Sequence, residues 1–277
     1  MGVASAAQVT LARTPASEYE STVEPRPPGA SVFEFLRMHE ILRCVMQRST
    51  DPTQPPPPPT PHPMPFTRVE VALLSLVEGR LCVLLGKRQE APYKGRWAIP
   101  GGVVRIDLDA DLEAAARRVA RERLNVSLPY LRQIGAVGGA ARDPRAPWAL
   151  SVVYRALVDA QALAATPGKR LETLGWWPAD AVQEAKPAFD HGALVAQAVE
   201  ALRAEVDRLE LPFGFLPQTF TLGELQHLCE ALLGRRLDKS SFRRRLAERD
   251  LLEPVPGAMR NGAFRPAQLY RARSLTS

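Results

Sequence analysis

Cysteine is scarce in this sequence of 277 residues, and Cys44, Cys82 and Cys229 lie far apart. The three form no CxxC pair and no even-numbered framework, so the sequence predicts neither a disulfide scaffold nor a zinc finger. The four histidines lack metal-ligand spacing, and no Ser/His/Asp or Cys/His arrangement suggests a nucleophile. His191, for example, follows an aspartate at an expected helix start, which is more typical of a capping or packing residue than of a catalytic one.

Long hydrophobic runs are also missing, and none reaches the roughly 18 apolar residues of a membrane span. The N-terminal residues show no basic region followed by an apolar one, so no secretory signal is expected. Hydrophobic residues make up 45% and charged residues 24% of the chain, which is the balance of a soluble globular protein. The length suggests two domains, and the reducing cytoplasm, near the nucleoid if the protein binds DNA, is the expected location.

The net charge of +6 is unevenly distributed. Residues 212–277 hold 11 Lys and Arg against six Asp and Glu, whereas residues 161–211 hold five against eight. A basic module behind an acidic connector favours nucleic-acid binding. A solvated, arginine-rich surface explains the charge equally well, so charge alone leaves both interpretations open.

Proline is concentrated at the N-terminus, where residues 1–65 hold 13 of the 26 prolines. The consecutive Pro55–Pro59 predict a stiff polyproline II linker, since proline has a fixed φ and no N–H donor. We therefore expect a disordered, Pro-rich extension over residues 1–65. Apolar residues at helical spacing predict a helix over 32–47, which either docks on a partner or on the body of the protein, or belongs to a dispensable extension.

Residues 66–185 are predicted to form a mixed α/β (α+β) domain, followed by a linker helix within residues 186–211. The helix Asp111–Leu124 has Asp111 as its expected N-cap, and Gly101-Gly102 are expected to interrupt the regular structure before it. A longer amphipathic helix is expected over 190–208. The expected strands are Val69–Val77, Leu81–Leu85, Ile134–Val137 and Leu150–Val158.

Residues 212–277 carry the signals of a winged helix-turn-helix. Thr221 is expected to cap a helix, with Glu224 at the capping-box position, and Gly234 is expected to end it. A second, basic helix is predicted over Lys239–Arg249, followed by a hairpin that ends near Tyr270.

One combination of motifs resembles the Nudix superfamily across residues 66–185. Lys87-Arg88-Gln89 follows a predicted strand, Gly95-Arg-Trp-Ala-Ile-Pro-Gly-Gly102 follows next, and a helix then begins Asp111-Leu-Glu-Ala-Ala-Ala-Arg-Arg118. The resemblance implies a Nudix-like sandwich. In Nudix enzymes three glutamates on one face of this helix hold Mg²⁺ against a diphosphate.

The chain departs from that pattern where the metal would bind. Arg118 keeps the family arginine and Glu122 one glutamate, but Val119 and Arg123 stand where the other two would be. Asn125 replaces the glycine, and the interval from Gly102 to Arg118 is two residues longer than in the family. Mg²⁺ requires several oxygen ligands, so we expect no catalysis and no need for a metal cofactor.

Two interpretations of the helix Asp111–Leu124 then remain. It either only covers the sheet, or it forms part of a pocket that binds a nucleotide without hydrolysing it. An active hydrolase with an unusual metal site is a further alternative, in which Asp107, Asp109, Asp111 or Glu113 would replace the missing carboxylates. If the pocket binds a phosphate, Arg123 would pair with it directly, while Trp97 would either stack on the ligand or, as is more common, pack in the core. The candidate ligand-binding residues are Lys87, Arg88, Arg96, Trp97, Gly101, Gly102, Arg118, Glu122 and Arg123.

The second module makes the resemblance more specific. Together with the degenerate Nudix motif, the chain resembles the NrtR and NadQ families of Nudix-related regulators of NAD metabolism over about residues 66–273. The segments that carry this resemblance are Ile134–Arg145, Leu216–Gln226, Leu237–Arg245 and Phe264–Tyr270. It implies a homodimer on a near-palindromic double-stranded DNA operator, and a small effector such as ADP-ribose or another NAD-related adenine nucleotide.

The basic helix would be the recognition helix, because short polar residues reach base edges and cations hold phosphates. Phe242 and Leu246 are expected to face the core, whereas Arg245 could lie on either side. A module that serves only protein contacts is the remaining alternative. The candidate DNA-binding residues are Lys239, Ser240, Ser241, Arg243, Arg244, Arg245, Arg260 and Arg265.

Overall fold

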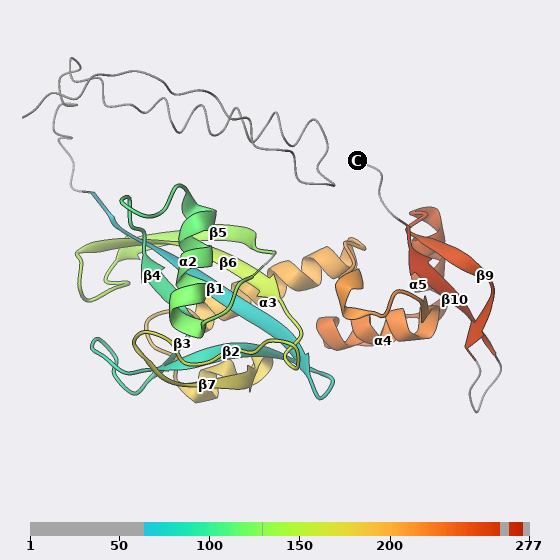
Figure 1. Ribbon diagram of the computed structural model, residues 1–277, viewed down its shortest axis with the longest axis horizontal. Helices are drawn as coiled ribbons and strands as arrows, with labels where there is room; N and C mark the ends of the chain where they lie inside the picture. Colours follow the sequence, from blue (N-terminus) through green and yellow to red (C-terminus); the bar gives the residue numbers. More distant parts are fainter. Residues whose placement is uncertain (1–63, 129, 261–265, 274–277) are drawn as a thin grey trace, which may run out of the picture. The chain divides into compact units, whose positions relative to one another are not determined.

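The computed structural model describes residues 64–128, 130–260 and 266–273 (Figure 1). The predicted N-terminal extension up to residue 63, its helix over 32–47, and Arg265 lie outside the described residues. Within the described part of the chain, every helix is too short or too polar to span a bilayer.

A mixed sheet forms the centre of the first domain. Its strands follow the order β3-β2-β1-β6-β5, with β4 paired to β1 and β7 paired to β2. The long strands β1 and β6 are parallel, with Val69 beside Val152, and the other pairs are antiparallel. The strands are β1 Phe66–Val77, β2 Arg80–Arg88, β3 Trp97–Ala98, β4 Gly101–Val103, β5 Arg132–Ala140, β6 Trp148–Leu157 and β7 Leu171–Pro178.

The alternation of side chains along β1 divides the hydrophobic core in two. Val71 and Leu73 belong to a cluster that includes helix α2, Leu112–Leu124. Ala72 and Leu74 belong to a second cluster that includes helix α3, His191–Asp207. The sheet thus lies between two helices, which explains why β1 is a nearly continuous apolar run in the sequence.

Both ends of α2 follow from local chemistry. Asp111 caps it as predicted, because its Oδ1 accepts a hydrogen bond of 2.7 Å from the backbone N–H of Ala114. Asn125 ends the helix in the left-handed conformation, with φ 55°. Asparagine tolerates this conformation better than most residues, which explains how it can replace the family glycine.

The expectation that Gly101-Gly102 interrupt the regular structure is wrong, because they form the short strand β4 against Arg68–Glu70. Glycine is required there by close packing. A β-carbon on Gly101 would overlap the Glu70 carboxylate, and one on Gly102 would lie 2.7 Å from Val119 Cγ2.

Helix α3, predicted as a linker, is also part of the core. Its buried residues Leu194, Val195 and Ala198 belong to the same cluster as β1 and β2. Further along the helix, Leu202 and Val206 join this cluster to the C-terminal helices. The short helix η1, Ala179–Ala185, precedes α3 and packs beside it.

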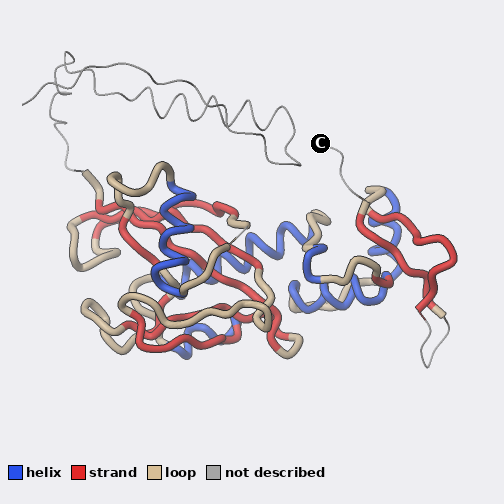
Figure 2. The backbone as a smooth tube through the Cα atoms, in the orientation of Figure 1, coloured by secondary structure: helices blue, strands red, loops and turns tan. Residues whose placement is uncertain are grey.

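The C-terminal residues fold as the predicted winged helix, whose helices and strands are distinguished in Figure 2. Thr221 and Glu224 form the expected capping box, and Gly234 ends the first helix with φ 69°. Phe242 and Leu246 are buried as expected. The elements are η2 Phe213–Phe215, β8 Phe220–Thr221, α4 Leu222–Leu233, α5 Lys239–Glu248, β9 Leu252–Arg260 and β10 Ala267–Ala272, with the strands in the order β8-β10-β9.

Candidate functional site

Five arginines from distant parts of the sequence line one pocket of the first domain. Ile99, Pro100 and Gly101 form part of its wall, and His191 lies at its edge. The arginines come from β1, the end of β2, the last turn of α2, the β5–β6 connection and the residue before β7: they are Arg68, Arg88, Arg123, Arg145 and Arg170.

Three of these arginines are paired with carboxylates. Arg68 Nε lies 2.8 Å from Glu70 Oε1. Asp143 pairs with Arg145 at 2.5 Å, and Glu90 pairs with Arg170 at 3.2 Å. The pKa of Glu70 is raised by burial in spite of the nearby Arg68, which weakens its contribution of negative charge.

The other two arginines donate hydrogen bonds only to backbone oxygens. Arg88 donates to the carbonyl of Pro92 at 2.7 Å. Arg123 donates to the carbonyls of Gly101 and Lys169, at 3.1 and 2.8 Å. Among the described residues, no carboxylate lies within ion-pair distance of either guanidinium. The pocket therefore carries an excess of positive charge.

The surroundings of Arg88 and Arg123 make their positive charges unfavourable. Burial lowers the pKa of Arg88, and the neighbouring Arg145 and Arg68 lower it further. Burial also lowers the pKa of Arg123, and Arg170 adds to the effect. Desolvation and repulsion between like charges both destabilise the cations. An anion bound between Arg88 and Arg123 would relieve both, because charge-assisted hydrogen bonds to phosphate are strong.

An aromatic ring packs against the same cluster. The guanidinium carbons of Arg88, Arg68 and Arg145 lie 5.1, 5.8 and 5.8 Å from the centroid of the Phe189 ring. Phe189 has a left-handed backbone, with φ 53°, a conformation that persists in a bulky residue only where the surrounding structure holds it. Cation–π contacts of this kind hold the arginines in place without neutralising them.

The residues at the former metal positions do not fit a metal ion. Val119 is 1% exposed and packs behind Gly102. Glu122 lies 3.5 Å from Arg118, and Arg123 reaches into the pocket. Within the described residues, no three His, Cys, Asp or Glu side chains gather as a metal would require. A single carboxylate beside two arginines does not provide the oxygens that Mg²⁺ needs.

The four acids that could have replaced the lost glutamates have partners within the protein. The Asp109 side chain is 1% exposed and accepts two hydrogen bonds from Arg118, which hold the pKa of its carboxyl below the usual range. It is therefore not the solvent-facing acid that its loop position suggests. Asp111 caps α2, Asp107 pairs with Arg105, and Glu113 pairs with Arg117.

The structure brings only part of the predicted ligand set together. Arg88, Gly101 and Arg123 line the pocket, whereas the other six candidates do not. Arg118 turns to Asp109, and Trp97 packs edge-on against Trp177, at 5.4 Å between ring centroids. Lys87 pairs with Glu172 at 3.1 Å, and Arg96 donates to the carbonyl of Lys186 at 2.7 Å. Gly102 lies on β4 against Val119, and Glu122 lies on α2 beside Arg118.

Three residues of the pocket were not predicted, namely Arg68, Arg145 and Arg170. Arg68 is, with Glu70, one of two charged residues near the start of a mostly apolar strand, which is the one signal in the sequence that singles it out. Arg145 and Arg170 lie in loops, and only the fold places them beside Arg68.

The basic face of the winged helix is formed by α5. Lys239, Ser240, Arg243 and Arg244 are exposed, whereas Ser241 is half-buried. Ser241 lies in the first turn, where its backbone N–H donates to the Asp238 cap at 2.8 Å. This arrangement presents cations and one small hydroxyl side chain on one side of a short helix, as a helix that enters a DNA groove requires.

Two other predicted DNA-binding residues have partners within the protein. Arg245 is half-buried and donates to the backbone carbonyl of Asp207, at the end of α3. Arg260 lies 3.2 Å from Glu224 and remains partly exposed.

Comparison with known proteins places both domains in established families. Residues 66–198 match the NUDIX domain, and residues 212–272 match the NrtR DNA-binding winged helix domain. The ADPR responsive transcriptional repressor NtrR of Acinetobacter baylyi is 37% identical over 207 residues, which make up 75% of this chain and 82% of that protein.

Solved structures agree with this result. Shewanella oneidensis NrtR, crystallised in complex with a 27mer DNA, superposes with a TM-score of 0.61 and 35% identity over 75% of this chain and 94% of that one. A MutT/nudix family protein from Enterococcus faecalis shares the fold, with a TM-score of 0.62 at 21% identity over 89% of this chain and 95% of that one.

Proposed function

Because the chain belongs to the NrtR family of Nudix-related transcriptional regulators, we propose that it is a repressor whose DNA binding responds to ADP-ribose or a related adenine nucleotide. The observation that carries the proposal is the arginine pocket, in which Arg88 and Arg123 are half-buried without carboxylate partners. A diphosphate has the negative charge that such a pair of guanidinium groups would bind.

The proposed binding mode dispenses with a metal. In a Nudix enzyme the third glutamate holds Mg²⁺, and the metal holds the diphosphate. Here Arg123 stands at that position and can donate to a phosphate oxygen itself. Since Val119 is buried and Arg118 is paired with Asp109, we expect neither Mg²⁺-dependent binding nor hydrolysis of nucleoside diphosphate derivatives.

The second half of the proposal concerns DNA. We infer that two copies of the chain bind a near-palindromic operator, because a two-fold symmetric site presents two half-sites to two recognition helices. Lys239, Ser240, Arg243 and Arg244 would provide the contacts. The regulated genes would concern NAD synthesis or salvage, and the protein would act in the cytoplasm, where its operator lies.

The test is to titrate ADP-ribose, NAD and ATP separately into a complex of the full-length protein with labelled operator DNA. We expect ADP-ribose to release the DNA equally well with Mg²⁺ and with EDTA. Product analysis of the same mixtures should find no cleavage of the diphosphate. If no nucleotide changes operator affinity in either direction, the sensor function is refuted. If ADP-ribose is turned over with Mg²⁺ in a reaction that Glu122→Gln abolishes, the protein is a hydrolase.

A further inference from the structure

Helix α3 is hydrogen-bonded, at its N-terminus and just before it, to residues 97–101, which run from β3 to β4. We call these residues the pocket loop, because most of them line the arginine pocket. The backbone N–H of Ala188 donates to the carbonyl of Trp97 at 2.7 Å. The backbone N–H of Ile99 donates to His191 Nδ1 at 3.1 Å. Arg123 donates to Gly101 in the same loop. A ligand that draws Arg123 towards itself therefore acts on a loop that is fastened directly to α3.

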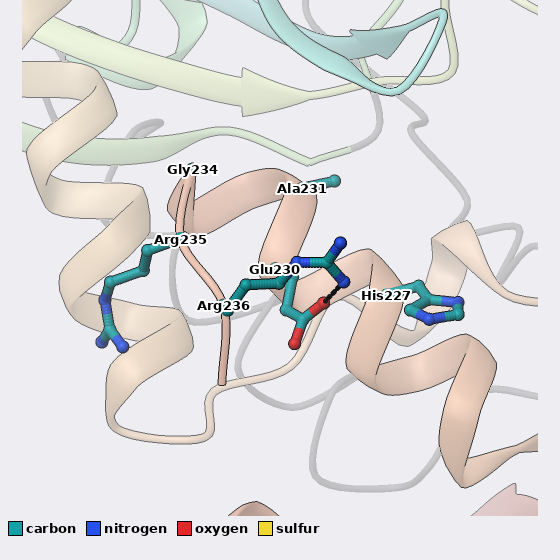
Figure 3. Close-up of a pocket in the computed structure, with 6 residues that line it drawn as sticks. All are labelled: His227, Glu230, Ala231, Gly234, Arg235 and Arg236. Atoms are coloured by element: carbon teal, nitrogen blue, oxygen red, sulfur yellow. Dashed lines mark hydrogen bonds and ion pairs between the residues drawn. The ribbon is translucent and has the colours of Figure 1, made fainter. Parts of the chain in front are cut away.

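The other end of α3 is bonded to the DNA-binding domain. Arg245 on α5 donates to the backbone carbonyl of Asp207, the last residue of α3. Arg235, in the turn between α4 and α5, pairs with the carboxylate of the same residue. Figure 3 shows Arg235 pointing away from Glu230 and Arg236, which pair with each other on the far side of the turn. Carbonyls at a helix C-terminus attract cations, so these contacts are favourable.

The last turn of α3 is also anchored to the sheet, by a different residue. Glu205 is buried and pairs with Arg155 on β6, and with Arg132 on β5 at 3.4 Å. Residues two positions apart point to different sides of a helix. Glu205 thus holds the Nudix domain, while Asp207 holds the winged helix.

Packing makes α3 a rigid connection between these ends. Its 17 residues span about 26 Å. Leu202 and Val206 share one hydrophobic cluster with Leu225 on α4 and Phe242 on α5. Because such cores do not deform continuously, a shift of α3 is passed to α5 rather than absorbed.

We propose that Arg245 is a positioning residue rather than a DNA contact. It fixes the recognition helix α5 to the C-terminus of α3, and the N-terminus of α3 is hydrogen-bonded to the pocket loop. An anion in the pocket therefore reorients α5. The inference rests on the proposed function, since it requires an effector and an operator. It assigns the coupling between them to Asp207 and Arg245. Because Arg245 Nη2 donates to the Asp207 carbonyl, its guanidinium lies against the end of α3.

The experiment compares the full-length wild-type protein with Arg245→Met, which keeps the aliphatic stem and removes the donors. Arg249→Met is the matched control, because Arg249 is exposed at the end of the same helix. For each protein, calorimetry gives the Kd for ADP-ribose without DNA. Fluorescence anisotropy gives the operator Kd over a range of salt concentrations, with and without saturating ADP-ribose.

In the wild type and the control we expect ADP-ribose to raise the operator Kd by about 5- to 150-fold, the usual range of allosteric coupling. In Arg245→Met this ratio should fall towards one, while the Kd for ADP-ribose stays within about two-fold and the slope of log K against log salt is unchanged. Arg245→Lys, which retains a donor, should recover part of the ratio. If Arg245→Met only destabilised the fold, its Kd for ADP-ribose would change together with the ratio of operator Kd values. Thermal melts would identify such a variant by its lower Tm.

Two results overturn the proposal. If Arg245→Met keeps the full ratio, α3 does not signal through this contact. If the salt slope falls by about one instead, Arg245 binds a phosphate. The proposed function fails separately, in the wild type itself, if ADP-ribose does not bind or does not change the operator Kd; the coupling role then fails with it.

Discussion

Replacing Arg123 with glutamine tests the arginine pocket most directly. The guanidinium is half-buried at the position of a Nudix metal-binding glutamate, and it donates only to the carbonyls of Gly101 and Lys169. Glutamine keeps a polar group of moderate length but removes the charge. The substitution therefore separates recognition of an anion from simple filling of the space.

The magnitude follows from the hydrogen bonds that a bound phosphate would form with Arg123. A hydrogen bond to a charged group contributes about 1.5–3 kcal/mol, which corresponds to roughly 10- to 150-fold in Kd. We therefore expect the Kd for ADP-ribose to rise by roughly 10- to 150-fold in the variant.

Isothermal calorimetry on the free protein measures this change, and Arg121→Gln is the control. Arg121 lies two residues earlier on α2 and is exposed, so its loss changes the net charge equally but not the pocket. The control should bind ADP-ribose as the wild type does. Equal affinity in all three proteins, or equal weakening in both variants, would refute the view that Arg123 contacts the diphosphate.

Three further predictions concern stability and DNA. Val119→Glu should lower the free energy of unfolding by several kcal/mol in urea titrations, because it buries an unpaired carboxylate behind Gly102; a loss below 1 kcal/mol would mean that the site opens easily. Burial, and then Arg68, lowers the pKa of His191 to about 3 from 6.5, so protons favour the unfolded state. Stability should fall as the pH decreases from 6.5, by up to about 1.4 kcal/mol per unit, and less steeply in His191→Asn; equal slopes would contradict this. Arg243→Ala should reduce the salt slope of operator binding by about one if Arg243 contacts a phosphate, and an unchanged affinity would remove it from the interface.

Local features were predictable from the sequence because their chemistry involves neighbouring residues. Asp111 caps α2, Thr221 and Glu224 form the capping box of α4, and Gly234 ends that helix, each through contacts within a few residues. Both domains could also be predicted, since the order of the Nudix and winged-helix motifs is specific. The sequence also predicted that Val119 and Arg123 replace two metal-binding glutamates, because the spacing of the motif is enough to identify those positions.

The pocket itself was decided by the tertiary structure. Arg68, Arg145 and Arg170 are separated by 25 to 102 positions in the sequence, and only the pairing of β1, β6, β2 and β7 brings them together. Arg118 has the family's position, yet it turns to Asp109 because the longer loop after Gly102 places a buried carboxylate beside it.

Arg245 shows, for a single side chain, the same difference between what the sequence determines and what the tertiary structure determines. The sequence determined that it lies at the edge of the apolar face of a basic helix, next to Leu246, but a long cation at such an edge can reach either solvent or the protein. The end of α3 settled the direction, since the carbonyl of Asp207 lies within reach and attracts a guanidinium. Periodicity determines which face of a helix is buried, whereas the partner of a flexible charged side chain depends on which groups the fold brings within its reach.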